Sequence, residues 1–133
     1  MQANLSKLVE LAGRVLLAVL FLIAGLSKIG GYAGTAGYMQ SHGIPGALLP
    51  LVIATEVGGA CLVVAGLWTR WAAVLLAGFT VLAALVFHTN FSDQVQQIMF
   101  MKNISIAGGF LLLVANGAGA WSLDAWRSTT RGR

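Results

Sequence analysis

Four long apolar stretches constrain the fold of this chain more than any other feature of its sequence. They cover about residues 11–29, 47–67, 71–88 and 103–120. A helix that crosses the roughly 30 Å hydrocarbon core of a bilayer needs about 20 mainly apolar residues. Membrane-spanning strands do not fit, because the stretches are too long and do not alternate with a period of two. We therefore predict an all-α integral membrane protein, a four-transmembrane-helix antiparallel bundle built by residues 1–133 as one domain.

Composition excludes several other classes of protein. Charged residues make up 9% of the chain and hydrophobic residues 58%, whereas a soluble domain carries about 25% charged residues. The net charge of +4 is better explained by membrane topology than by a nucleic-acid-binding surface. A single cysteine, Cys61, excludes an internal disulfide, a CxxC redox pair and covalent c-type haem. With two histidines and four acidic residues, we expect no metal site and no covalent cofactor.

Basic residues are distributed unequally between the two sides of the predicted membrane. The side that holds both termini carries Lys7, Arg14, Arg70, Arg127, Arg131 and Arg133. The opposite side carries only Lys28 and Lys102. Because segments rich in Lys and Arg stay in the cytoplasm, both termini are predicted to be cytoplasmic. All four tryptophans fall on that same side, as an interfacial aromatic belt would: Trp68, Trp71, Trp121 and Trp126.

The connecting segments also carry information. Residues 30–46 have room for a short interfacial helix, and the amphipathic segment 93–101 can extend the fourth membrane helix. The turn at residues 66–71 is so short that the helices on either side should be antiparallel neighbours. Two pairs of small residues would allow close helix contact within one chain or in a homo-oligomer: Ala54 with Gly58, and Ala115 with Gly119.

Each predicted helix carries a stripe of small and polar residues at helical spacing, the pattern that packs helices together in lipid. The four stripes are Arg14, Ala18, Phe21, Gly25 and Lys28; Glu56, Gly59, Ala60 and Val63; Thr80, Ala84 and His88; and Lys102, Ser105, Gly109, Leu112 and Asn116. Packing alone explains the small residues. The charged residues are costly in lipid, so they should face the interior of the bundle.

Glu56 is the most informative residue, because it lies about 14 Å along the second helix and hence near the membrane midplane. We expect a polar network that joins Glu56 to Lys28 or Lys102, with His88 and Asn103 in the same outer half of the bundle. Each lysine could instead extend to the outer interface. An unpaired Glu56 would be protonated and could exchange a proton with a ligand.

A second polar cluster is predicted at the inner face, where Arg14, Arg70 and Asp124 have a similar depth. Arg14 lies about 5 Å inside the inner boundary. It could pair with Asp124, cap carbonyl groups at a helix end, or bind a lipid phosphate. A structural role for this cluster is favoured over a catalytic one.

The order and context of the charged residues resemble the DoxX family of small bacterial membrane proteins. The shared elements are Arg14 with the AGLSK segment ending at Lys28, EVGGACLVVAGLWTR at 56–70, and KNISIAGGFLLLVANGAGAWSLD at 102–124. The resemblance covers residues 11–126. It implies a multi-pass, four-helix protein of the bacterial inner (cytoplasmic) membrane. Family members are linked to thiosulfate:quinone oxidoreductase subunits and to redox or oxidative-stress complexes, so a membrane or peripheral redox protein is an implied partner.

Three functions are compatible with these features. The first is a membrane subunit that binds an isoprenoid quinone or a lipid with Glu56, Lys28, His88 and Lys102, because such ligands suit an apolar cavity with a few polar groups. The second is a non-catalytic membrane anchor or assembly factor. The third, a small transporter, is less favoured, because four-helix exporters carry their buried glutamate in the first helix. Whether the chain is an enzyme is left open.

Overall fold

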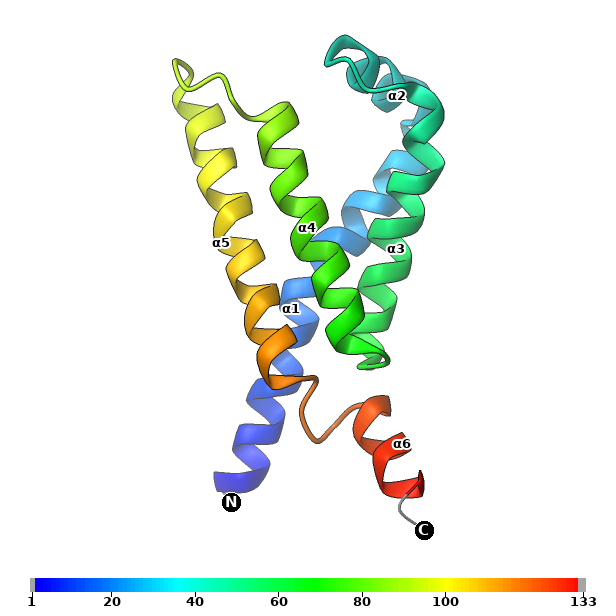
Figure 1. The fold of residues 1–133 in the computed structure, drawn as a ribbon, viewed down its shortest axis with the longest axis vertical. Helices are drawn as coiled ribbons and strands as arrows, with labels where there is room; N and C mark the ends of the chain where they lie inside the picture. Colours follow the sequence, from blue (N-terminus) through cyan, green and yellow to red (C-terminus); the bar gives the residue numbers. More distant parts are fainter. Residues whose placement is uncertain (1, 132–133) are drawn as a thin grey trace.

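The computed structural model describes residues 2–131, which form helices joined by short connections (Figure 1). The elements are α1 (Gln2–Gly30), α2 (Tyr32–Ser41), the 3-10 helix η1 (Gly46–Leu48), α3 (Leu49–Ala65), α4 (Thr69–Phe87), α5 (Gln94–Asn116) and α6 (Leu123–Arg131). Four of the described segments are long and apolar enough to cross a membrane: α1, η1 with α3, α4 and α5. The predicted all-α architecture with four transmembrane helices is confirmed.

The long helices pack in an antiparallel order. Helix α1 packs on α3, α3 on α4 and α4 on α5, and α1 also contacts α5. The start of α1, the α3–α4 turn and α6 therefore lie at one end of the molecule, here named the α6 end (Figure 1). Helix α2 and the α4–α5 turn lie at the other, the α2 end. Arg133, which the sequence places with the α6 end, lies outside the described residues.

Helix α1 begins before its predicted boundary and α5 ends before its own, whereas the predicted extension of the fourth helix into segment 93–101 is confirmed. Helix α1 begins at Gln2, because polar residues continue the helix beyond the apolar stretch. Helix α5 begins at Gln94, where the Asp93 carboxylate accepts a hydrogen bond from the backbone N–H of Val95 at 3.0 Å. The same helix ends at Asn116, before two glycines with positive φ. The predicted pairing of Ala115 with Gly119 on one helix face is therefore wrong.

The segment between the first two membrane spans contains the expected short helix, α2. Its Tyr38 ring stacks on Phe87, the last residue of α4, with ring centroids 5.3 Å apart. His42 packs on the same two rings. This aromatic contact connects α2 to α4 across the α2 end.

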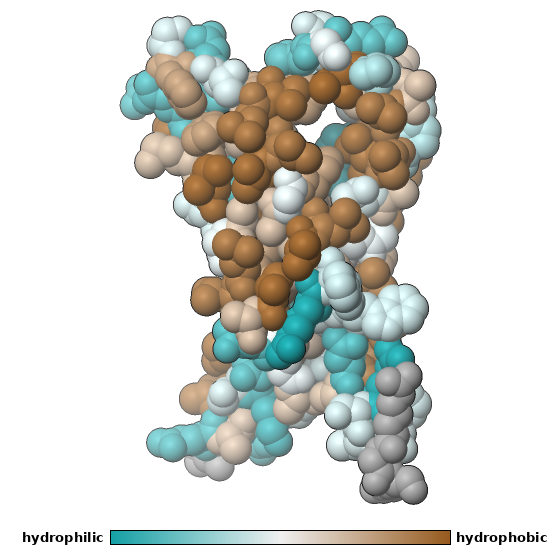
Figure 2. Space-filling model, in the orientation of Figure 1, coloured by the Kyte–Doolittle hydropathy of each residue, from teal (hydrophilic) through white to brown (hydrophobic). Residues whose placement is uncertain are grey.

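The core is built from small residues and a few large ones. The buried faces of α1 and α3 contain most members of their predicted stripes, including Ala18, Phe21, Gly59 and Ala60. Phe21 meets Phe110 of α5 edge to face, with centroids 5.4 Å apart. Apolar side chains cover the middle of the molecule on the face shown in Figure 2, whereas polar side chains gather at both ends.

The stripe predicted for the fourth membrane helix is wrong. Lys102, Ser105, Leu112 and Asn116 are exposed on α5. Its buried residues are instead Ala107 and Phe110. The apolar composition of α5 allows several faces to pack, and the face that meets α4 is the one that carries these two residues and Asn103.

Candidate functional site

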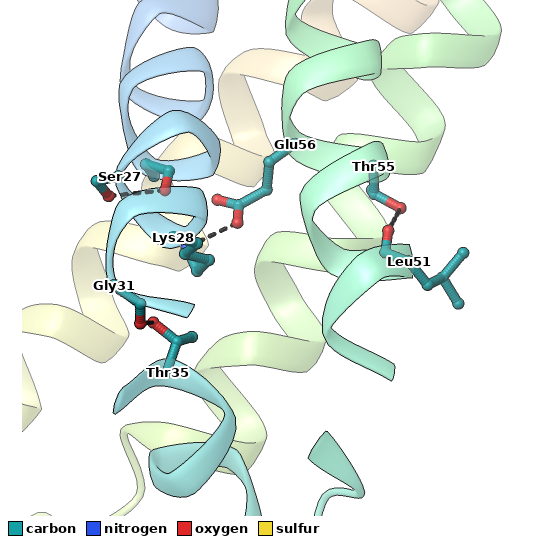
Figure 3. A network of polar contacts seen from close by, with 8 residues as sticks. Ser27, Lys28, Gly31, Thr35, Leu51, Thr55 and Glu56 are labelled. Atoms are coloured by element: carbon teal, nitrogen blue, oxygen red, sulfur yellow. Dashed lines mark hydrogen bonds and ion pairs between the residues drawn. The ribbon is translucent and has the colours of Figure 1, made fainter. Parts of the chain in front are cut away.

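An ion pair joins α1 to α3 within the membrane-spanning part of the bundle. The Lys28 ammonium lies 2.7 Å from Oε1 of Glu56, whose side chain is only 4% exposed. Figure 3 shows the Glu56 side chain pointing from α3 toward α1. Gly25 makes this approach possible, because a Cβ at that position would lie 3.1 Å from Cβ of Glu56 and 2.6 Å from Val57. Lys28 thus lies about one turn after this close approach of α1 to α3.

Neighbouring hydroxyl groups do not hydrogen-bond to this ion pair. Ser27 donates to the Ala24 carbonyl, Thr35 to Gly31 and Thr55 to Leu51, so each hydroxyl bonds within its own part of the chain (Figure 3). Among the described residues, Lys28 is the one polar partner of the Glu56 carboxylate. The Lys28 side chain is 27% exposed, so its ammonium group can also meet another molecule.

Polar groups of α4 and α5 lie at a similar level of the bundle. A Cβ at Gly59 would lie 3.0 Å from Leu76, which sets the register between α3 and α4. Because the two helices are antiparallel, Thr80 then lies about level with Glu56. Thr80 is buried and donates to the Leu76 carbonyl at 2.7 Å. Its own carbonyl accepts from Asn103 Nδ2 at 3.3 Å, which links α4 to α5.

Two other predicted site residues lie apart from the ion pair. Lys102 is exposed, and among the described residues its ammonium has one hydrogen-bond partner, Met99 Sδ at 3.8 Å. His88 directly follows α4, and its Nδ1 lies 3.0 Å from Gln96 Oε1. The structure therefore brings Glu56 together with Lys28, but not with Lys102 or His88.

Arg14 is almost completely buried at the α6 end, where it binds backbone carbonyl groups from two parts of the chain. Its Nη1 donates to Ala118 at 2.5 Å, and its Nη2 donates to Val64 at 3.1 Å and to Trp121 at 3.0 Å. Val64 belongs to the last turn of α3, whose carbonyls lack partners within the helix. Of the roles considered for Arg14, the structure shows the capping of carbonyl groups.

Asp124 holds the start of α4 from outside that helix. Its two carboxylate oxygens accept the backbone N–H groups of Trp68 at 2.7 Å and Thr69 at 2.9 Å. Its own N–H donates to the Gly66 carbonyl at 2.8 Å. Trp68 has a left-handed backbone with φ of +48°, an uncommon conformation for a residue other than glycine. Asp124 thus fixes a strained turn and caps α4 in place of a local residue.

The surroundings of Asp124 lower the pKa of its carboxyl group. Partial burial raises this pKa, but the hydrogen bonds from Thr69 and Trp68 and the nearby charge of Arg127 lower it by more. The net pKa lies below the ordinary aspartate value, so the carboxylate remains ionised at neutral pH.

We name this arrangement the C-terminal clasp: Arg14, Gly66 and Asp124, together with residues 117–122. A Cβ at Gly66 would collide with Ser122, so the clasp requires glycine at the α3–α4 turn. Arg70 is exposed beside Gly117 and donates no hydrogen bond to a described residue. The structure thus places Arg14 and Asp124 in the clasp and Arg70 at its edge. The sequence places Gly66 near a helix end, as the structure confirms, but it gives no signal for the close contact with Ser122.

The chain is similar to one protein family and to several known proteins. Its residues 9–89 match the DoxX family model. It is 52% identical to "Inner membrane protein YqjF" of Escherichia coli (strain K12), over 86% of this chain and 88% of that protein. It is 41% identical to "Inner membrane protein YphA" of the same organism, over 86% of each chain. It is 37% identical to "Putative oxidoreductase CatD" of Bacillus subtilis (strain 168), over 55% of this chain and 54% of that one.

No solved structure matches the chain. The family model covers more than half of its residues, and two relatives that align over most of their length are named inner membrane proteins. Together with the four apolar helices, these matches show that the chain is an integral membrane protein that belongs to the DoxX family.

Proposed function

We propose that this protein is a membrane subunit of a redox system and that it binds an isoprenoid quinone beside Lys28 and Glu56. The observation that carries the proposal is the ion pair itself. Charged side chains within a membrane span are costly and commonly mark ligand or proton pathways. The Bacillus relative whose printed name is "Putative oxidoreductase CatD" supports the redox class.

The chemistry of the pair suits a quinone headgroup. The ammonium of Lys28 has three donors and forms a single ion pair, with Glu56, so donors remain for a quinone carbonyl. The Glu56 carboxylate can accept a hydrogen bond or a proton from a quinol hydroxyl. Figure 2 shows an opening in the upper part of the molecule, at the α2 end. In this proposal the chain binds the headgroup and exchanges its protons, and a partner redox protein exchanges the electrons.

The proposal includes an orientation in the membrane. The α6 end carries Lys7, Arg14, Arg70 and Arg127, whereas the α2 end carries Lys28 and Lys102. By the positive-inside rule, the α6 end and both termini face the cytoplasm. The ion pair then lies in the periplasmic half of the inner membrane.

The test measures quinone that stays with the purified protein. Wild type, Glu56→Gln and Lys102→Met would be extracted with surrounding lipid into polymer discs, and quinone per chain would be quantified by chromatography of organic extracts. Glu56→Gln keeps the side-chain shape and removes the charge, so it should lower bound quinone roughly tenfold. Lys102→Met removes an exposed charge away from the pair and should retain the wild-type amount. Wild type with no more quinone than an unrelated membrane protein would refute the proposal.

A second candidate function is a non-catalytic membrane anchor or assembly factor. It is favoured by the observation that the ion pair joins α1 to α3 and the clasp joins the C-terminal segment to α3 and α4. In that case Glu56→Gln should lower thermal stability, and no quinone should be found in either form. Thermal unfolding and quinone content, measured on the same samples, separate the two functions.

A further inference from the structure

Two grooves meet at Trp68 on the α6 end, remote from the ion pair. One, of about 420 Å³, is lined by Trp68 and by the polar side chains of Asp124, Arg127 and Ser128, and is here named the polar groove. The other, of about 440 Å³, is apolar and is lined by Leu62, Trp68, Trp71, Ala72 and Leu75. The left-handed backbone of Trp68, fixed by Asp124, places its indole ring on the boundary of both grooves.

The polar groove holds one cation and one anion side by side. Asp124 and Arg127 are a single helical turn apart on α6, yet their charged atoms form no ion pair in the described chain. The Arg127 guanidinium lies 5.8 Å from the centre of the Trp68 ring and donates no hydrogen bond to a described residue. Its donors can therefore bind an external anion, and a cation placed near the Asp124 carboxylate would be attracted to it.

The apolar groove continues from this position onto the membrane-facing surface. Leu62 lies in the last turns of α3, and Leu75 lies in the second turn of α4, both within membrane-spanning helices. Trp71 is 80% exposed at the helix start, as is typical of tryptophan at the headgroup level of a bilayer. An acyl chain beginning at that level can lie along these side chains.

We propose that the two grooves together form a binding site for phosphatidylethanolamine. The lipid phosphate binds Arg127, the ammonium group lies by Asp124, and one acyl chain lies along Leu62, Trp71 and Leu75. A zwitterionic headgroup matches both charges of the polar groove. An anionic headgroup matches only the arginine and is repelled by the carboxylate. This site is independent of the quinone proposal, since it uses none of the same residues.

The test is a lipid titration of delipidated protein in mild detergent, with bound lipid counted by native mass spectrometry. Phosphatidylethanolamine should bind more tightly than phosphatidylglycerol with the same acyl chains. Arg127→Gln should weaken phosphatidylethanolamine binding about fivefold. Lys7→Gln, which removes the same charge at the same end, should leave binding unchanged. Equal affinity for the two lipids, or equal effects of the two variants, would overturn the proposal.

A third variant tests the apolar groove separately. Trp71→Ala should weaken the binding of both lipids, because it shortens the wall that contacts the acyl chain. Glycerophosphoethanolamine, which carries the headgroup without acyl chains, should not displace the bound lipid. Wild-type binding by Trp71→Ala, or displacement by the free headgroup, would overturn the assignment of the acyl chain to this groove. Circular dichroism and thermal unfolding establish that each variant is folded.

Discussion

Replacing Arg14 with alanine should destabilise the protein more than any other removal of a single charge at the α6 end. The guanidinium donates to three carbonyl groups, and these come from the end of α3 and from the segment that precedes α6. Alanine would leave all three acceptors without this partner. It would also loosen residues 117–122 from the bundle, because Arg14 donates the hydrogen bonds that join Ala118 and Trp121 to α1.

The structure sets the size of this effect. A hydrogen bond that involves a charged group contributes about 1.5–3 kcal/mol, and a buried carbonyl without a partner costs about 1–3 kcal/mol. The three bonds share one guanidinium, so their contributions do not add fully. Water at the membrane interface can also reach the carbonyls once the clasp opens. We therefore expect Arg14→Ala to lower the free energy of unfolding by about 3–5 kcal/mol.

The assay is reversible unfolding in mixed micelles, followed by circular dichroism. Arg70→Ala is the matched control, because it removes the same charge from the same end, where the guanidinium is exposed. This control should stay within about 0.5 kcal/mol of wild type. Arg14→Lys should be intermediate, since an ammonium group keeps the charge but lacks the planar fork of donors. Equal losses in Arg14→Ala and Arg70→Ala would refute the reasoning.

Four further changes test the clasp, the ion pair and the topology. Gly66→Ala should cost about 1–3 kcal/mol in the same assay because its Cβ collides in a left-handed backbone, whereas Gly58→Ala, which meets no atom within 4 Å, should be neutral. The pKa of Asp124 is lower in the folded protein than in the unfolded chain, where it is about 3.9. The ionised carboxylate therefore stabilises the fold fully at pH values above 3.9, and this stabilisation is lost as the pH falls through the native pKa. Asp124→Ala should therefore flatten that part of the stability profile and cost about 1 kcal/mol at pH 7. Lys28→Met alone should be less stable than the double variant Lys28→Met/Glu56→Leu, because the single change leaves a buried carboxylate without its partner; the reverse order would contradict the pairing. A reporter fused to the C-terminus should read cytoplasmic, and a periplasmic signal would reverse the proposed orientation.

The four membrane spans were predictable, because bilayer thickness fixes the length of an apolar helix. The buried faces of α1 and α3 were also predictable, since their charged and small residues share one face. The buried face of α5 was not predictable from the sequence. Its small and apolar residues occur on several sides, so the packing of α4 decides that Ala107 and Phe110 are buried and that Lys102 is exposed.

The candidate site was predictable in its residue types but not in its pairing. Glu56 needed an interior partner, yet the sequence gives only the depth of Lys28 and Lys102. The choice depends on α1 being the helix that packs on α3, where Gly25 allows close contact. The C-terminal clasp was harder to predict from the sequence than the ion pair. Arg14 binds backbone carbonyls, which leave no sequence signal, and Asp124 caps a helix that begins 55 positions earlier in the chain.

The most direct test of the proposed quinone site is photolabelling with an azido-quinone in native membranes, followed by mass spectrometric mapping of the labelled peptides. A quinone beside the ion pair predicts labelling of α1 and α3 near Lys28 and Glu56, and a loss of that labelling in Glu56→Gln. Labelling confined to the α6 end, or labelling of α1 and α3 that persists in Glu56→Gln, would contradict a quinone site at this pair.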